Sequence, residues 1–134
     1  MYKLTYEECR NLISKMSYSK TSDIFGKEKG KGLLKGIIDS IYQSAFGEEA
    51  YPSIEEKAAN PLNFIIKDHP FVDGCKRIVA TTFLYFLDSN QILYKNNKKI
   101  LSDSTLVALT LLIAESRPLE KEIMINVIMN FLEW

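Results

Sequence analysis

The sequence has little histidine, little cysteine and no net charge, and each shortage excludes a class of protein. Among its 134 residues there are one histidine and two cysteines, and 17 basic and 17 acidic residues cancel to a formal net charge of zero. A chain without net charge has no long-range field that would draw it to nucleic acid or to a membrane surface. Cys9 and Cys75 show neither metal-ligand spacing nor a disulfide framework, which is typical of a reducing compartment.

Long apolar segments are also missing. The longest nearly apolar run, Leu106 to Ala114, is too short to cross a bilayer, and the first eight residues contain no apolar signal core. We therefore expect a cytoplasmic protein with neither membrane nor nucleic acid as a partner, although secretion as an effector through an uncleaved signal would escape this test. The basic run from Lys27 to Lys35 is interrupted by Glu28 and by glycines, so a solvated surface is expected there.

The chain does contain a series of helical patterns. With 134 residues and 46% hydrophobic side chains, it has the size and composition of one domain spanning residues 1–134. Capping-box spacing at Thr5 and Glu8, and again at Ser53 and Glu56, predicts two helix starts. Between the turns, apolar residues recur at helical spacing. The predicted helices cover residues 5–17, 33–44, 53–67, 75–90, 103–115 and 118–132.

Two of these helices and two of the connections have special features. Pro61 lies inside the third helix, where a kink or tight packing is expected. The fourth helix is apolar on nearly all sides, which is typical of a central, buried helix. Residues 45–53 predict a loop or short hairpin, and residues 92–101 predict a small hairpin around Asn96 and Asn97. The predicted fold class is all-α, a helical bundle with one or two short β-hairpins.

The stretch DHPFVDGCKRI, residues 68–78, places polar groups between two apolar helices. Gly74 precedes the fourth helix, whose free N–H groups and dipole favour an anion, and it permits close approach of a ligand. Arg77 offers a planar fork for phosphate oxygens. Asp73 supplies the hard oxygen that Mg²⁺ takes when phosphates complete its coordination. His69 carries the imidazole suited to general base catalysis near neutral pH. These groups predict phosphoryl or nucleotidyl transfer.

The letters HPFVDGCKR at residues 69–77 resemble the signature loop of the Fic/Doc (Fido) family, HPFx[DE]GNGR. The segments YPSIEEKAA and FLYFLDSN resemble its RhuM-type, virulence-associated branch. The resemblance covers residues 4 to 132 and implies the Fic/Doc helical bundle. It also implies transfer of AMP, or of another phosphate-containing group, from a nucleotide such as ATP to a hydroxyl group of a target protein, with Mg²⁺ as cofactor. An antitoxin partner or self-inhibition is a further expectation.

By position, the resemblance implies a role for each residue of the loop. His69 would be the catalytic base, Phe71 would anchor the loop in the core, and Asp73 would hold Mg²⁺. The target-docking flap of the family would correspond to residues 43–51. The nucleotide phosphates would be bound by Gly74, Cys75, Lys76 and Arg77.

Three departures from the family pattern bear on the reaction. Cys75 replaces an asparagine that contacts phosphate, and a thiol is a much weaker donor than an amide, so phosphate binding or rate should suffer. Lys76 replaces a glycine of AMP-transferring members and resembles Doc, a toxin that phosphorylates a translation elongation factor; the side chain would reverse the nucleotide and present its γ-phosphate. Ala80 replaces a second arginine, again as in Doc. A Doc-like kinase is therefore slightly preferred to AMP transfer.

Several residues have a second interpretation. Asp73 could cap the fourth helix as well as bind metal. Cys75 could be the reactive thiol of a Cys/His nucleophilic enzyme, although a small, partly buried residue is favoured. Ser116 and Glu120 have the spacing of the family's inhibitory motif [ST]xxxE[GN], but Lys121 follows, so an ordinary helix start is favoured. For the whole chain, the alternative is a catalytically weak or inactive nucleotide-binding or protein-interaction module, such as a toxin relic.

Overall fold

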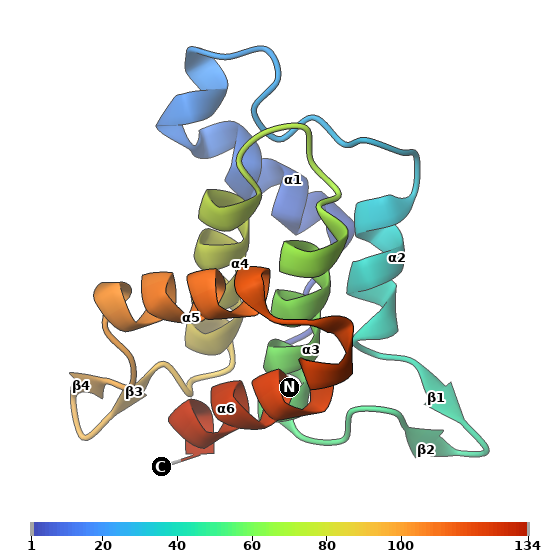
Figure 1. Ribbon diagram of the computed structural model, residues 1–134, viewed down its shortest axis with the longest axis vertical. Coiled ribbons are helices and arrows are strands. Elements are labelled where there is room, and N and C mark those ends of the chain that lie inside the picture. The colour runs from blue at the N-terminus through green and yellow to red at the C-terminus, as the bar shows by residue number, and fades with distance from the viewer. Residues whose placement is uncertain (1, 134) are drawn as a thin grey trace.

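The computed structural model describes residues 2–133, which form six α-helices, two 3₁₀ turns and two hairpins with two-residue strands (Figure 1). This arrangement confirms the all-α class and both hairpins. The elements in chain order are α1 (Tyr6–Lys15), η1 (Ser17–Lys20), α2 (Leu33–Ser40), β1 (Ser44–Ala45), β2 (Glu48–Glu49), α3 (Ile54–Asp68), α4 (Cys75–Ser89), β3 (Tyr94–Lys95), β4 (Lys98–Lys99), α5 (Asp103–Glu115), η2 (Pro118–Glu120) and α6 (Lys121–Glu133).

The predicted caps explain where the first helices begin. The Thr5 hydroxyl oxygen accepts a hydrogen bond of 3.2 Å from the Glu8 N–H, and the Ser53 hydroxyl oxygen accepts one of 3.0 Å from the Glu56 N–H. Each bond satisfies one of the N–H groups that an α-helix leaves free in its first turn. The helix starts predicted at Thr5 and Ser53 are therefore confirmed. The second helix ends at Ser40, four residues earlier than predicted, because strand β1 begins at Ser44.

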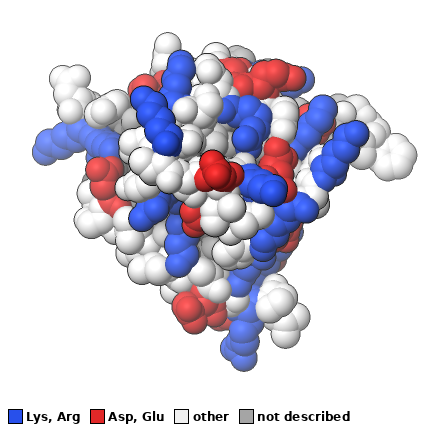
Figure 2. All heavy atoms as spheres, turned by 90° about the horizontal axis from the view of Figure 1, so that it is seen from above, with Lys and Arg blue, Asp and Glu red and all other residues white. Residues whose placement is uncertain are grey.

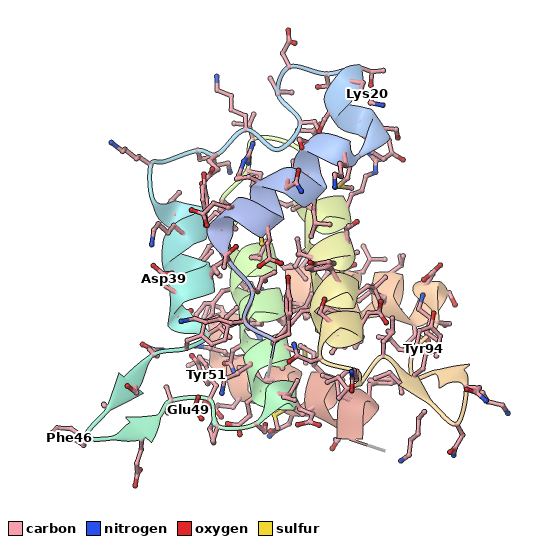
Figure 3. The ribbon with its side chains drawn as sticks, turned by 180° about the vertical axis from the view of Figure 1, so that it is seen from behind. Lys20, Asp39, Phe46, Glu49, Tyr51 and Tyr94 are labelled. Atoms are coloured by element: carbon pink, nitrogen blue, oxygen red, sulfur yellow. The ribbon has the colours of Figure 1, made fainter. Side chains whose placement is uncertain are left out.

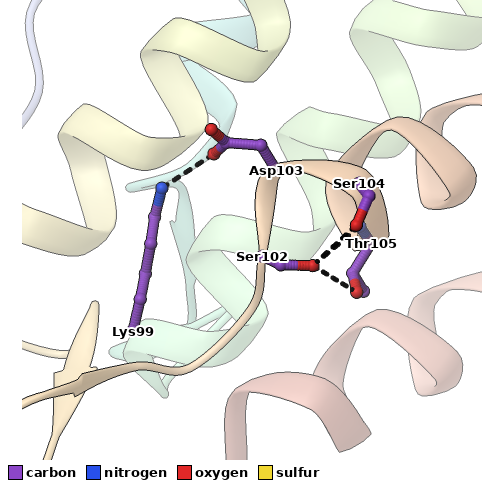
Figure 4. A network of polar contacts seen from close by, with 5 residues as sticks. All are labelled: Lys99, Ser102, Asp103, Ser104 and Thr105. Atoms are coloured by element: carbon purple, nitrogen blue, oxygen red, sulfur yellow. Dashed lines mark hydrogen bonds and ion pairs between the residues drawn. The ribbon is translucent and has the colours of Figure 1, made fainter.

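Helix α5 starts from a local polar network (Figure 4). The Ser102 hydroxyl oxygen accepts a hydrogen bond of 3.1 Å from the Thr105 N–H, which is again an N-cap. Lys99 in β4 forms an ion pair of 2.8 Å with Asp103 in the first turn. The predicted hairpin therefore leads directly into α5. Its turn residues Asn96 and Asn97 have φ angles of 54° and 65°, the conformation that asparagine tolerates in tight hairpin turns.

Helix α3 is the centre of the molecule. It contacts α2, α4, α5 and α6, and in Figure 1 α5 crosses in front of α4 and α3 while α6 crosses in front of α3. Its buried positions include the small residues Ala58 and Ala59, which let neighbouring helices approach closely. The sequence predicted this central place for the more apolar α4. The prediction holds for burial, because only Lys76, Arg77 and Asp88 of α4 are exposed. It is wrong for the central place, because α4 contacts α1, α3 and α5, whereas α3 contacts α2, α4, α5 and α6.

Pro61 lies within α3, which nevertheless runs from Ile54 to Asp68 without interruption. Proline has no N–H, so the carbonyl of Lys57 lacks its usual intrahelical donor. One turn earlier, the side-chain amide of Asn60 donates a bond of 2.9 Å to the Glu56 carbonyl. The unbroken helix places the segment that follows Asp68 at the far end of α3 from its N-cap. No helix within residues 2–133 is long and apolar enough to cross a membrane.

Candidate functional site

The loop between α3 and α4 begins at His69 with a sharp reversal of the backbone. His69 ends α3 in the left-handed conformation, with φ 47° and ψ 62°, and its N–H donates a bond of 3.1 Å to the Ile65 carbonyl. Left-handed residues often terminate helices, but a residue other than glycine or asparagine is less common there. The turn leaves the His69 side chain exposed, whereas Phe71 is only 1% exposed. Phe71 thus lies in the core, as a loop anchor would.

Gly74 is the N-cap of α4, and its surroundings explain the glycine. Its φ angle of 92° lies in the left-handed region, and a Cβ atom added there would lie 2.4 Å from the ring of Phe25. From the sequence we expected this glycine to allow close approach of a ligand. In the structure the ring of Phe25, from the chain itself, packs against it. Because the N-cap is Gly74, the alternative in which Asp73 caps α4 is wrong.

A cleft of about 390 Å³ opens at the start of α4. Its walls include the exposed side chains of His69, Asp73, Lys76 and Arg77, and its remaining lining residues are Phe71, Val72, Gly74 and Cys75. The first-turn N–H groups of α4 have no intrahelical acceptor and form the positive end of the helix dipole. The structure therefore brings together every residue of the loop that the sequence proposed for catalysis, metal binding and phosphate binding. The volume is within the range of small-molecule sites.

A segment that the sequence did not connect with the site packs along this loop. The N–H of Gly26 donates to the Asp73 carbonyl at 3.0 Å, the N–H of Lys29 donates to the Pro70 carbonyl at 2.8 Å, and the N–H of Val72 donates to a carbonyl of the segment at 2.7 Å. Residues 25–29 therefore form short bridges with the motif loop. The sequence predicted only a solvated surface from Lys27 onward, and the aromatic side chain of Phe25 beside Gly26 is the feature that could have indicated packing.

The same segment is fixed to α1. The Arg10 guanidinium donates a bond of 2.7 Å to the Gly26 carbonyl and lies 3.7 Å from the Glu28 carboxylate. The Tyr6 hydroxyl donates to that carboxylate, and this hydrogen bond, with burial, raises the pKa of Tyr6. Gly26 also packs tightly, since a Cβ there would lie 2.5 Å from the Ile13 side chain. The motif loop thus has a rigid support on the side of α1.

The face that carries the cleft is rich in cations. Lys27 and Lys29 of the supporting segment are exposed, as are Lys76 and Arg77 at the start of α4. Figure 2, which views the molecule from above, shows Lys and Arg side chains spread over this face with Asp and Glu among them. A chain with no net charge therefore still presents local positive charge where an anion would bind.

The residues predicted as a target-docking flap lie elsewhere. Residues 43–51 contain hairpin β1–β2, which stands at the end of α3 opposite to the motif loop (Figures 1 and 3). Lys57 in α3, only 1% exposed, fixes the hairpin there by an ion pair of 3.1 Å with Glu49 and a hydrogen bond to the Tyr51 carbonyl. A helix of 15 residues is about 22 Å long. The flap prediction is therefore wrong for this hairpin, which is too far from the cleft.

Cys75 is buried and faces the loop. It is 6% exposed, and its Sγ lies 3.6 Å from the Phe71 carbonyl oxygen, to which the thiol donates. Burial raises the pKa of Cys75, while the bond to Phe71 and the charge of Lys29 oppose this shift. A thiol with a raised pKa is a poor nucleophile. The geometry therefore favours a small residue that supports the loop over a catalytic cysteine.

We expect iodoacetamide at neutral pH to alkylate both Cys75 and Cys9 at least about ten times more slowly in the native protein than in the unfolded protein. Both thiols are buried, at 6% and 2% exposure, and burial raises the pKa of Cys9 to about 12. Alkylation requires thiolate, which is scarce in both cases. A mass-spectrometric time course on the native protein measures the two rates, and the urea-unfolded protein is the control in which both should react quickly. Alkylation of Cys75 in the native protein as fast as in the unfolded protein would contradict this expectation.

Ser116 and Glu120 lie at the turn between α5 and α6. The Glu120 carboxylate accepts a bond of 2.7 Å from the Arg117 N–H, and the Ser116 hydroxyl donates to the Ile113 carbonyl at 2.7 Å. Lys67 at the end of α3 donates to the Ser116 carbonyl, which holds this turn against α3. These contacts are those of a helix end followed by a helix start, the favoured interpretation. Among the described residues Glu120 forms no ion pair with Arg77, and self-inhibition stays a prediction.

Asp73 is the residue of the cleft that could hold a metal ion. Within residues 2–133 there is no group of three or more His, Cys, Asp or Glu side chains that could hold one. Mg²⁺ is commonly bound through one or two carboxylates, with phosphate oxygens and waters completing its coordination. The single exposed carboxylate of Asp73 on the wall of the cleft fits the protein part of this donor set.

Comparison with known proteins gives one match. A protein-family model described as the Fic/DOC family matches residues 3–87, more than half of the chain and including every residue that lines the cleft. No curated protein and no solved structure matches the chain.

Proposed function

We propose, because this chain belongs to the Fic/DOC family, that it transfers a phosphate-containing group from an Mg²⁺-bound nucleotide such as ATP to a hydroxyl group of a protein. Family membership supports transferase activity in general. One observation carries the finer proposal: a single cleft at the start of α4 is lined by His69, Asp73, Lys76 and Arg77. A base, a metal ligand and two cations around one anion site are the groups that phosphoryl transfer requires.

In this reaction His69 accepts the proton of the target hydroxyl as its oxygen attacks the γ-phosphorus. A new oxygen–phosphorus bond forms, the bond to the bridging oxygen breaks, and ADP leaves with the electron pair. Lys76, Arg77 and the first N–H groups of α4 meet the negative charge on the phosphates. Asp73 would hold Mg²⁺ against the phosphate oxygens, where the ion would withdraw charge from the reacting phosphate. The exposure of His69 leaves it accessible to a protein substrate.

Two side chains favour phosphate transfer over AMP transfer. Lys76 is exposed and lines the cleft, and its side chain would take space that a glycine would leave to the nucleotide. Ala80, one turn further along α4, contributes no charge to the adjoining groove of about 340 Å³. We propose on this basis a Doc-like kinase, within the RhuM-type branch that the segments YPSIEEKAA and FLYFLDSN suggest.

Incubation with a cell lysate and labelled ATP tests the proposal. We expect label from the γ-phosphate, and none from the α-phosphate, to appear on a protein target, because the reversed nucleotide presents its γ-phosphate to His69. Autoradiography of the separated proteins measures transfer of the γ-label and of the α-label in parallel reactions. Transfer of the α-label alone would contradict phosphate transfer but retain the family chemistry, and a lysate without added enzyme is the control for endogenous kinases.

A second candidate, a weakened nucleotide-binding domain, is favoured by the position of Cys75. Its Sγ is buried against the Phe71 carbonyl, so this position contributes a backbone N–H to the cleft but no amide side chain. The variant Cys75→Asn separates the candidates. If the wild-type protein transfers neither label and Cys75→Asn transfers one, the natural domain binds nucleotide with little catalysis.

A further inference from the structure

The Arg77 side chain contacts an aromatic ring that has no role in the proposed reaction. The central carbon of its guanidinium group lies 4.2 Å from the centroid of the Tyr18 ring. This distance is within the range of a cation–π interaction. In the same position Arg77 lines the phosphate cleft. The guanidinium group is thus held by a neighbouring ring while it forms part of the anion site.

Tyr18 is itself fixed to the motif loop. It belongs to the turn η1, and its ring packs against Phe25 with centroids 5.4 Å apart and planes inclined by 33°. Phe25 is 6% exposed and fills the space beside Gly74 that a Cβ would need. A continuous line of contacts therefore runs from Gly74 through Phe25 and Tyr18 to Arg77, and both of its ends belong to the signature loop.

The contact leaves the hydrogen-bonding capacity of Arg77 free. A cation–π contact joins the charge of the guanidinium group to the ring face, so it places no carbonyl or carboxylate acceptor on the N–H donors of Arg77. Among the residues that the structure describes, Arg77 forms no ion pair with a carboxylate. The ring of Tyr18 therefore orients Arg77 without competing with a phosphate for its donors.

We propose that Tyr18 is a positioning residue that holds the Arg77 guanidinium in the cleft before the nucleotide binds, and so strengthens binding of the terminal phosphate. The expected effect on ATP binding rests on the proposed function. The contact between Tyr18 and Arg77 concerns the protein without nucleotide and can be tested separately. A long, exposed arginine loses rotamer freedom when it binds a ligand, and a partner that restricts it beforehand reduces that loss.

Binding measurements by calorimetry with Mg²⁺-ATP and with AMP test the effect of Tyr18 on nucleotide affinity. We expect Tyr18→Leu to bind ATP about two- to fivefold more weakly, the effect of one exposed cation–π contact, and to bind AMP unchanged because AMP lacks the terminal phosphate. Tyr18→Phe keeps the ring and should match wild type. Tyr94→Leu, a change at another exposed tyrosine in hairpin β3–β4, is the matched control and should also match wild type.

A double variant separates positioning from general support of the fold. Because Tyr18 acts through Arg77, Tyr18→Leu should add nothing to the loss of ATP affinity in Arg77→Gln. Additive losses, or an equal loss of ATP and AMP affinity in Tyr18→Leu, would mean that Tyr18 supports the loop as a whole, and would overturn the inference.

Nuclear magnetic resonance of the ligand-free protein tests the contact between the Tyr18 ring and Arg77 independently of nucleotide binding. The side-chain resonances of Arg77 should show the upfield ring-current shift of a group above an aromatic face, kept in Tyr18→Phe and lost in Tyr18→Leu. A wild-type protein without this shift refutes the positioning role. A wild-type protein that shows the shift but binds no ATP refutes the proposed function and the phosphate role of Tyr18 with it.

Discussion

Replacing His69 is expected to lower the rate of phosphate transfer by about 10²- to 10⁴-fold, the usual contribution of a general base. In the proposed reaction the imidazole, which lines the cleft, takes the proton of the target hydroxyl. Affinity for Mg²⁺-ATP should change little, because in the proposed site Lys76, Arg77 and the N–H groups of α4 would bind the phosphates. Initial rates of γ-label transfer, with ATP affinity measured separately, test both expectations.

The choice of substitution matters because His69 ends α3 in the left-handed conformation, with φ 47°. Alanine is strained there, whereas asparagine tolerates the left-handed region and commonly ends helices in this way. His69→Asn therefore keeps the backbone of the loop but cannot act as a base, and His69→Ala removes the imidazole with some strain in addition. If His69→Asn retains more than a tenth of the wild-type rate, His69 is not the base.

The second large effect concerns stability, and we expect Gly74→Ala to lower the free energy of unfolding by about 2–4 kcal/mol. A left-handed φ of 92° is unfavourable for alanine by about 1 kcal/mol or more. The new Cβ would also lie 2.4 Å from the Phe25 ring, and overpacking of this kind typically costs about 1–3 kcal/mol. Urea unfolding followed by circular dichroism measures the change.

Two other glycines provide matched controls for Gly74→Ala. Gly32 has a φ of 83° but no atom within 4 Å of an added Cβ, so Gly32→Ala should show the backbone strain alone, about 1 kcal/mol. Gly36 lies inside α2 with open space around it and no left-handed φ, so Gly36→Ala should stabilise the protein by about 0.5–1 kcal/mol. A loss in Gly74→Ala no larger than that in Gly32→Ala would show that the Phe25 ring moves aside at little cost.

Much of the local structure could be predicted because its causes are local. The Thr5 and Ser53 hydroxyls cap helices through N–H groups three residues away, and Asn96 with Asn97 forms a turn within a single hairpin. The motif loop is equally local, because the residues that line the cleft lie between positions 69 and 77. One helix end, one loop and one helix start carry all of them, so their spacing in sequence is nearly their arrangement in space.

Contacts between distant segments were predicted poorly. The segment around Phe25 joins the motif loop through backbone N–H and carbonyl groups, which all residues except proline have and which therefore leave no pattern in the sequence. The loop or short hairpin predicted at residues 45–53 is present as hairpin β1–β2, but the flap assigned to residues 43–51 lies at the opposite end of α3 from the cleft, because a turn does not indicate what it lies beside. Burial of Cys75 against the Phe71 carbonyl likewise depends on the surrounding core.

The sequence by itself determined the helix starts, the tight turns and the set of polar groups around one helix N-terminus, because each depends on residues within a few positions of one another. Only the tertiary structure decided which segment supports the loop, why residue 74 is glycine, and where Arg77 is held. These features depend on the side chains of Tyr18 and Phe25, some 50 residues away in the chain from the loop. Packing brings them to the site, and packing depends on the whole core rather than on local spacing.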